Sequence, residues 1–190
     1  MACAVGVPRA AFAAEPDTDT TVRLLRQGGV VLVMRHALAP GTFDPPEFKL
    51  DVCATQRNLS DEGRAQARRI GRWFARHQLK PTKVLSSPWC RCLDTAALAF
   101  GRVQPWAALA SPVGRSADVN LRSQRELALA MAMAAVGNHA SGFEVWVTHQ
   151  FVINDLAGLT TDSGEGVLLR ADASSAATSA VQVVGRMPLL

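Results

Sequence analysis

The run Val30-Val31-Leu32-Val33-Met34 constrains the fold of this chain more than any other feature of its sequence. A continuous apolar run rich in β-branched residues favours a strand that is buried on both faces, as strands of parallel sheets are. Residues 144–148 form a second run of this kind. Segments with helical spacing lie between such runs, and this alternation predicts a layered α/β domain with a largely parallel sheet.

The other elements follow from helical spacing, turn residues and shorter apolar runs. We expect helices over residues 21–27, 61–78, 90–100, 121–136 and 151–159. We expect strands over residues 30–34, 83–86, 102–106, 144–148, 167–171 and 181–187, the last one at an edge of the sheet. The Pro-rich segment 39–55 is expected to be a long irregular loop, and loops of that length are often functional.

The composition excludes several classes of protein. A chain of 190 residues with 48% apolar and 19% charged residues is an ordinary single globular domain with a proper core, not a disordered chain. No apolar stretch approaches the ~20 residues of a membrane-spanning helix. The net charge of +4 suits an anionic substrate. The sequence lacks the dense basic blocks that would indicate nucleic-acid binding.

The first 20 residues allow two interpretations. Residues 1–14 are small and apolar, and Ala13-Ala14 before Glu15-Pro16 resembles a signal-peptidase site. A basic n-region and a long apolar h-region are missing. Residues 1–20 are therefore expected to be either a signal-peptide remnant of a periplasmic or secreted protein, or the disordered tail of a cytoplasmic one. The folded domain is expected over residues 21–190.

The pair Arg35-His36 directly follows the first buried strand, and sites in parallel sheets form at the carboxyl ends of strands. A neutral imidazole can attack phosphorus and form a phosphohistidine. An adjacent guanidinium offers a planar set of donors to phosphate oxygens. An Arg-His pair is common by chance, however, and a histidine that only caps its strand is the more frequent case.

Arg91 and His149 occupy comparable positions. Arg91 lies in the first turn of an expected helix, where the helix dipole and free backbone N–H groups also favour an anion. His149 follows the strand over residues 144–148. If that strand neighbours the first one, His149 meets His36 over one crevice and can stabilise charge on a transferring phosphoryl group. The alternatives are an exposed surface arginine and a structural histidine.

Four blocks of the sequence resemble, in order, the motifs of the histidine phosphatase (phosphoglycerate mutase-like) superfamily. The blocks are Arg35-His36-Ala37, residues 58–67, residues 86–96 and Thr148-His149. The resemblance implies a three-layer α/β/α sandwich with a mostly parallel central sheet. Residues 51–63, 89–92 and 148–150 further resemble small exported bacterial members, some grouped with lipopolysaccharide core heptose phosphatase-like proteins.

This resemblance implies a phosphatase that hydrolyses a phosphomonoester through a phosphohistidine on His36. Arg35, Arg91 and His149 would complete the phosphate pocket, with no metal or organic cofactor required. The expected partner is a phosphorylated small molecule or a phosphate ion, not nucleic acid. A phosphoglycerate mutase-type phosphotransferase and a non-catalytic phosphate-binding module remain alternatives.

The sequence departs from the family pattern at two positions. Ala37 replaces the usual glycine after the nucleophile, which a negative φ would tolerate. The expected general acid after the third strand has Asp118 as its candidate, although Asp118 could equally be the N-cap of the next helix. Glu126 is the next carboxylate and is expected inside that helix. Thr42 could donate its hydroxyl to a phosphate.

The cysteines leave two possibilities open. In an exported protein Cys53 could pair with Cys90 or with Cys92, whereas in a reducing compartment all three would be free thiols. The spacing of Cys90 and Cys92 does not match a zinc site.

Overall fold

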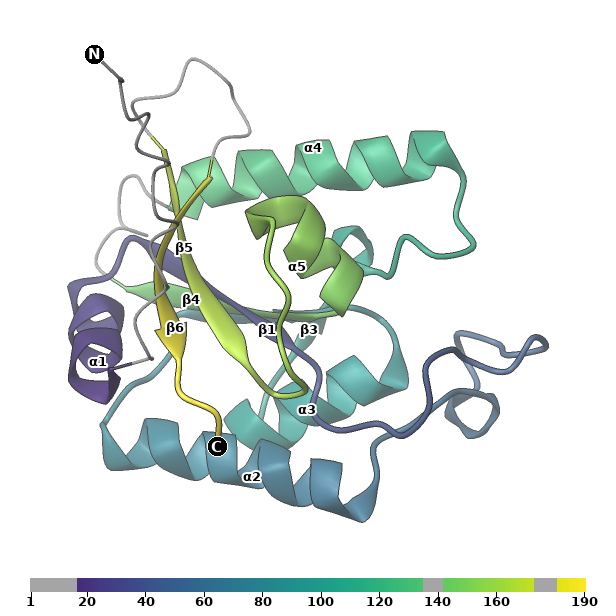
Figure 1. Ribbon diagram of the computed structural model, residues 1–190, viewed down its shortest axis with the longest axis horizontal. Helices are drawn as coiled ribbons and strands as arrows, with labels where there is room; N and C mark the ends of the chain where they lie inside the picture. The colour runs from purple at the N-terminus through teal and green to yellow at the C-terminus, as the bar shows by residue number, and fades with distance from the viewer. Residues whose placement is uncertain (1–16, 135–141, 173–180) are drawn as a thin grey trace, which may run out of the picture.

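The structure is a computed structural model that describes residues 17–134, 142–172 and 181–190 (Figure 1). Residues 1–16, for which a signal-peptide remnant or a disordered tail is expected, lie outside the described residues. The first helix, α1 (Thr18–Gln27), begins earlier than predicted because Asp17 accepts hydrogen bonds from the N–H groups of Asp19 and Thr20. Residues 17–20 therefore belong to the folded domain and not to the tail.

Each predicted helix and strand has a counterpart among the described residues, and residues 135–136 of the predicted fourth helix lie outside them. The other helices are α2 (Asp61–Arg76), α3 (Cys90–Phe100), α4 (Ala117–Ala134) and α5 (Gln150–Ala157), with short 3-10 turns η1 (Cys53–Thr55) and η2 (Ala107–Leu109). The strands are β1 (Val30–Arg35), β2 (Lys83–Ser86), β3 (Gln104–Pro105), β4 (Phe143–Thr148), β5 (Gly166–Ala171) and β6 (Val181–Met187). Strand β3 is shorter than predicted.

Helix α4 begins earlier than predicted, at Ala117. The hydroxyl of Ser116 accepts a hydrogen bond from the N–H of Val119 at 3.4 Å, so Ser116 caps this helix. The N-cap role considered for Asp118 is wrong, because Asp118 lies inside the first turn.

The six strands form one sheet in the order β3-β2-β4-β1-β5-β6. The pairs β3-β2, β2-β4 and β4-β1 are parallel, whereas β5 is antiparallel to both β1 and β6. Strand β6 lies at an edge, as predicted. Figure 1 shows α2 and α3 covering one face and α4 and α5 the other, which is the predicted α/β/α sandwich.

The central position of β1 explains its continuous apolar sequence. Val30, Leu32 and Met34 pack into the core that also holds side chains of α1, α2 and α3. Val31 and Val33 pack into the opposite core, with side chains of α4 and α5. Both faces of β1 are covered, so no position tolerates a polar side chain until the strand ends at Arg35.

Three parallel strands end beside one another. The N–H of His36 donates to the carbonyl of Thr148 at 2.9 Å, and the N–H of Ser87 donates to the carbonyl of Val147 at 2.9 Å. The residues that follow β1, β2 and β4 are thereby held together at the carboxyl ends of these parallel strands.

Candidate active site

His36 and His149 lie side by side at the carboxyl ends of β1 and β4. Their ring centres are 5.7 Å apart, with the planes at 69°. Only 2% of His36 and 4% of His149 is exposed. The predicted meeting of the two imidazoles follows from the pairing of β1 with β4.

The orientation of the His36 ring leaves one nitrogen free for chemistry. Nδ1 lies 2.8 Å from the carbonyl oxygen of Ala37. Because a carbonyl only accepts, Nδ1 carries the proton and Nε2 carries the lone pair. Burial, opposed by the hydrogen bond to Ala37 and helped by the positive charge of Arg91, lowers the pKa of His36 to about 3. His36 is therefore neutral at pH 7, which is the form that a nucleophile needs.

Ala37 fits its position, although the family that the sequence resembles usually has a glycine there. Among the described residues other than glycine, only Gln78 has a positive φ, so Ala37 has an ordinary backbone. Its N–H donates to Oγ1 of Thr95 at 3.0 Å, and that hydroxyl donates to the carbonyl of Arg91 at 2.7 Å. The backbone beside His36 is thereby tied to α3.

Arg91 is buried beside His149. Its Nη2 donates to Nδ1 of His149 at 3.4 Å, since a guanidinium only donates. Nε2 of His149 then donates to Oγ of Ser87, 2.8 Å away. Burial lowers the pKa of His149 well below its ordinary value, and the positive charge of Arg91 adds to the effect. Both imidazoles in the site are neutral.

Arg57 is a site residue that the sequence analysis missed. It lies in the same cavity as Arg35 and Arg91. Burial lowers its pKa, and the charge of Arg91 lowers it further. The one signal in the sequence is that Arg57 directly precedes Asn58, the first residue of the second resembling block.

Each of the three arginines has an N–H donor that makes no hydrogen bond within the described residues. Arg35 donates from Nη1 to the carbonyl of Thr161 at 2.7 Å, and Arg57 donates from Nη1 to the carbonyl of Ala39. The Nε atoms of Arg35, Arg57 and Arg91 are buried and have no hydrogen-bond partner within the described residues. Buried donors are normally satisfied, so these atoms suit an anion bound among them.

Asp44 is the one carboxylate among the described residues that line this cavity. Its oxygens accept from Nη1 of Arg91 at 2.8 Å, from the N–H of Arg57 at 2.9 Å and from Nε1 of Trp89 at 3.1 Å. Burial tends to raise its pKa, but the hydrogen bonds from Arg91 and Arg57 lower it below the ordinary value. Asp44 is therefore ionised and acts as an acceptor.

The cavity has a volume of about 400 Å³. The predicted site residues Arg35, His36, Thr42, Arg91 and His149 all line it. The structure does not bring Asp118 or Glu126 to it, because both lie on α4 and neither lines the cavity. Neither of the two carboxylates that the sequence offered as a general acid therefore lines this cavity.

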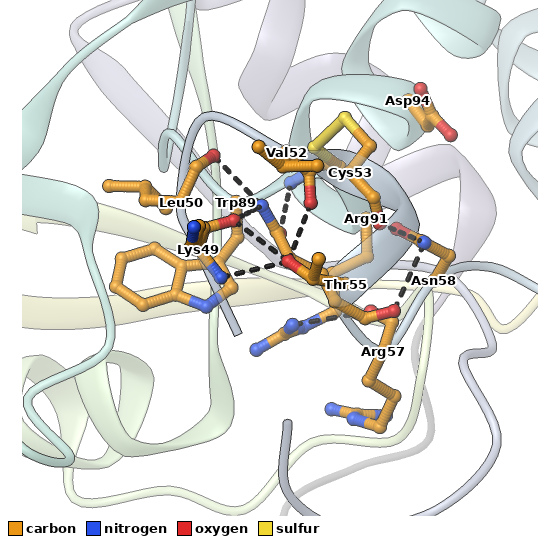
Figure 2. Close-up of a disulfide and its surroundings, with 12 residues drawn as sticks. Lys49, Leu50, Val52, Cys53, Thr55, Arg57, Asn58, Trp89, Arg91 and Asp94 are labelled. Atoms are coloured by element: carbon orange, nitrogen blue, oxygen red, sulfur yellow. Dashed lines mark hydrogen bonds between the residues drawn. A yellow bond between two sulfur atoms is a disulfide. The ribbon is translucent and has the colours of Figure 1, made fainter. Parts of the chain in front are cut away.

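The long loop over residues 39–57 is covalently linked to the start of α3. Cys53 forms a disulfide with Cys90, and the Cα atoms are 5.7 Å apart (Figure 2). Of the two pairings left open by the sequence, this one is found. Cys92 is a buried free thiol whose pKa burial raises to about 12. Arg91, between the two cysteines, is thereby held next to the loop that carries Asp44 and Arg57.

Gln56 adds a second attachment at the same point. Its Oε1 accepts from the N–H of Cys90 at 3.0 Å, which satisfies a free donor at the start of α3. Its Nε2 donates to the carbonyl of Leu50 at 2.8 Å, within the loop. Figure 2 shows the hydrogen bonds that hold Lys49 and Leu50 against Thr55 and the neighbouring loop residues.

The second resembling block positions the segment after His36. A Cβ atom on Gly63 would lie 2.0 Å from the carbonyl oxygen of Leu38, so only glycine allows α2 to approach this closely. Gln66 accepts from the N–H of Leu38 at 3.0 Å and donates to the carbonyl of Ser163 at 2.7 Å. Helix α2 therefore contacts both the segment after His36 and the loop before β5, in which the N–H of Gly164 donates to the carbonyl of His36 at 3.1 Å.

Residues 17–134, 142–172 and 181–190 contain no group of three or more His, Cys, Asp or Glu side chains that could hold a metal ion. Within the same residues, no helix combines the length and apolar character needed to cross a membrane.

Comparison with known proteins agrees with this geometry. Residues 31–111 match the family model of the histidine phosphatase superfamily (branch 1). No curated protein sequence matches the chain. Residues 31–111 contain Arg35, His36, Arg57 and Arg91, whereas His149 lies beyond the matched segment.

Solved structures of phosphatases share the fold. The protein histidine phosphatase SixA, complexed with tungstate, has 20% identity and a TM-score of 0.54, covering 84% of this chain and 96% of its own. A mycobacterial glucosyl-3-phosphoglycerate phosphatase has 17% identity and a TM-score of 0.57, with coverages of 82% and 97%. A phosphoserine phosphatase mutant from Entamoeba histolytica, in complex with phosphoserine, has 13% identity and a TM-score of 0.55, with coverages of 83% and 95%. The family model thus matches the part of the chain from β1 to the segment after η2, and these solved structures share its fold.

Proposed function

We propose that this protein is a phosphatase that hydrolyses a phosphomonoester through a phosphohistidine on His36. The observation that carries the proposal is a neutral, buried imidazole with a free Nε2 in a cavity lined by three arginines. With Asp44 ionised, these arginines leave a net positive charge that matches a phosphate dianion. Buried guanidinium donors stabilise the charge of a transferring phosphoryl group strongly, because little water screens them.

The reaction has two steps. Nε2 of His36 attacks phosphorus, the bond from phosphorus to the ester oxygen breaks, and the leaving oxygen takes a proton from a solvent water molecule. The hydroxide formed from that water is neutralised by the proton that the attacking water loses in the second step. A water molecule then attacks the phosphohistidine, the N–P bond breaks, and its electron pair returns to Nε2. The products are the free alcohol or phenol, inorganic phosphate and neutral His36. Arg35, Arg57 and Arg91 hold the phosphoryl oxygens in both steps.

His149 has a second arrangement open to it in this reaction. When a bound phosphate accepts from Nη2 of Arg91 in place of Nδ1 of His149, the hydroxyl of Ser87 can donate to Nε2 of His149 in place of accepting from it. Nδ1 of His149 then carries the proton and donates to the phosphoryl group. The 2.8 Å contact between Ser87 and His149 supports this exchange, because a hydroxyl both donates and accepts.

The similar structures favour hydrolysis over transfer. Those compared above are phosphatases, one with tungstate and one with phosphoserine bound. These ligands support a phosphorylated small molecule or a phosphate ion as the partner of this chain. The mutase alternative is not favoured, and a binding module without turnover is separated from the proposal by experiment.

The experiment measures hydrolysis of p-nitrophenyl phosphate by the wild type, His36→Gln and His77→Gln. His77 caps α2 and does not line the cavity. We expect His36→Gln to lose at least about a thousandfold in kcat/KM, because the covalent route is closed. His77→Gln should keep the wild-type rate. Equal rates for His36→Gln and the wild type would refute the proposal.

We also propose that the protein is exported and lies among small exported members of the superfamily, near the lipopolysaccharide core heptose phosphatase-like group. The Cys53–Cys90 disulfide supports export, because such bonds persist mainly in oxidising compartments. Fractionation of the native host, followed by thiol labelling before and after reduction, tests this. A cytoplasmic protein with Cys53 and Cys90 reduced would contradict it.

A further inference from the structure

The outer part of the cavity is lined by apolar side chains. Phe43 is 65% exposed, Val113 is 49% exposed and Phe151 is 48% exposed, and all three line the same cavity as His36. They come from three separate segments: the loop after β1, the loop before α4, and the start of α5. Single exposed apolar residues are ordinary, but a group at the mouth of one cavity indicates a binding surface.

The described lining of the cavity includes four charged residues. They are Arg35, Asp44, Arg57 and Arg91. Asp44 is ion-paired with Arg91, and the three arginines are the groups that the phosphate requires. The described lining includes no further cation to hold a carboxylate or a second phosphate on the leaving group. The mouth therefore favours a leaving group without charge.

The site also favours a leaving oxygen that departs without a strong acid. Asp44 is ionised and accepts three hydrogen bonds, so it has no proton to give. Asp118 does not line the cavity. A phenol has a pKa near 10, about six units below that of an ordinary hydroxyl, so a phenolate leaves with little assistance.

From these observations we propose that the substrate is an aryl phosphomonoester, whose uncharged aromatic ring is held between Phe43, Val113 and Phe151. This inference rests on the proposed function. In the first step the phosphorus–oxygen bond breaks with its electron pair going to the phenolate oxygen, which takes its proton from water. Ring contacts with Phe43 and Phe151 give the aryl group binding energy that a hydroxylated sugar would not gain.

The test uses inhibitors that are not hydrolysed, so that differences in leaving-group reactivity do not enter. Competitive inhibition of p-nitrophenyl phosphate hydrolysis is measured with phenylphosphonate, methylphosphonate and inorganic phosphate. We expect phenylphosphonate to bind at least about tenfold more tightly than methylphosphonate, as apolar pocket contacts of this size give. Phe43→Ser and Phe151→Ser should each reduce that ratio severalfold and leave inhibition by inorganic phosphate unchanged.

Leu129→Ser is the matched control, because Leu129 is equally exposed, at 66%, but lies on α4 and does not line the cavity. It should keep the wild-type ratio. A ratio near one in the wild type would overturn the aryl proposal alone. If the wild type does not hydrolyse p-nitrophenyl phosphate at all, the proposed function fails together with this inference.

Discussion

Nη1 of Arg91 lies 2.8 Å from Oδ1 of Asp44, in an ion pair whose side chains are only 5% and 11% exposed. The pair joins the long loop after β1 to the first turn of α3. It fixes the guanidinium that faces His149, so the geometry of the candidate active site depends on a contact between residues far apart in the sequence.

Asp44→Ala should therefore be strongly destabilising. Removing one partner of a buried pair leaves an uncompensated charge, and we expect the free energy of unfolding in urea to fall by about 3 kcal/mol. Asp94→Ala is the control, since the Arg64–Asp94 pair is 38% and 39% exposed and should contribute about 0.5 kcal/mol. Equal losses in the two variants would contradict the account.

The stability of the protein should depend on pH through His36. Its pKa is about 3 in the folded protein and about 6.5 when unfolded, so the unfolded chain binds more protons between these values. The stability that neutral His36 contributes is present above pH 6.5 and is lost progressively as the pH drops toward 3. The free energy of unfolding should be about 2 kcal/mol lower at pH 5 than at pH 7 from His36 alone. His36→Gln should remove that part of the dependence. An unchanged pH dependence in this variant would show that His36 is not held neutral.

Gly63→Ala separates helix propensity from packing. Alanine stabilises an ordinary helix position by about 1 kcal/mol over glycine. Here the added Cβ would meet the backbone carbonyl of Leu38, which is two residues after His36. We expect a net loss of about 2 kcal/mol in the free energy of unfolding and a fall of at least about tenfold in kcat/KM. Arg68→Ala, on the exposed face of α2, is the control and should be near neutral. Stabilisation by Gly63→Ala would refute the close approach.

The disulfide should affect both stability and phosphate binding. It closes a loop between residues 37 positions apart, which corresponds to about 3–4 kcal/mol of stabilisation. The double variant Cys53→Ala, Cys90→Ala should lose that stability and bind phosphate more weakly, because Asp44 and Arg57 belong to the released loop. Titration calorimetry with inorganic phosphate measures the second effect. Unchanged affinity would show that Gln56 and the Arg91–Asp44 pair hold the loop without the disulfide.

The sequence predicted the elements well because their signals are local. The apolar run before Arg35 and the Ser60 cap of α2 are local patterns, and the structure confirms the elements that they predict. The pairing of β1 with β4, which joins His36 to His149, was left conditional because periodicity does not fix strand order.

The missed parts of the site depend on the path of an irregular loop. Asp44 and Arg57 reach Arg91 through the segment 39–57, which has no periodicity to interpret. The choice of Cys90 over Cys92 is also three-dimensional, because residues two apart on a helix point about 200° apart. Cys90 faces the loop, whereas the thiol of Cys92 lies 3.6 Å from Nε2 of His149.

The central claim is that His36 becomes phosphorylated, and intact-protein and peptide mass spectrometry after rapid alkaline quenching of p-nitrophenyl phosphate turnover tests it most directly. The wild type should show one phosphoryl group on the peptide that contains His36, labile to acid, and the signal should decay once substrate is exhausted. His36→Gln should show none, and His77→Gln should match the wild type. A wild type that hydrolyses the ester with no phosphoryl group on His36, or with the group on another residue, would contradict the account.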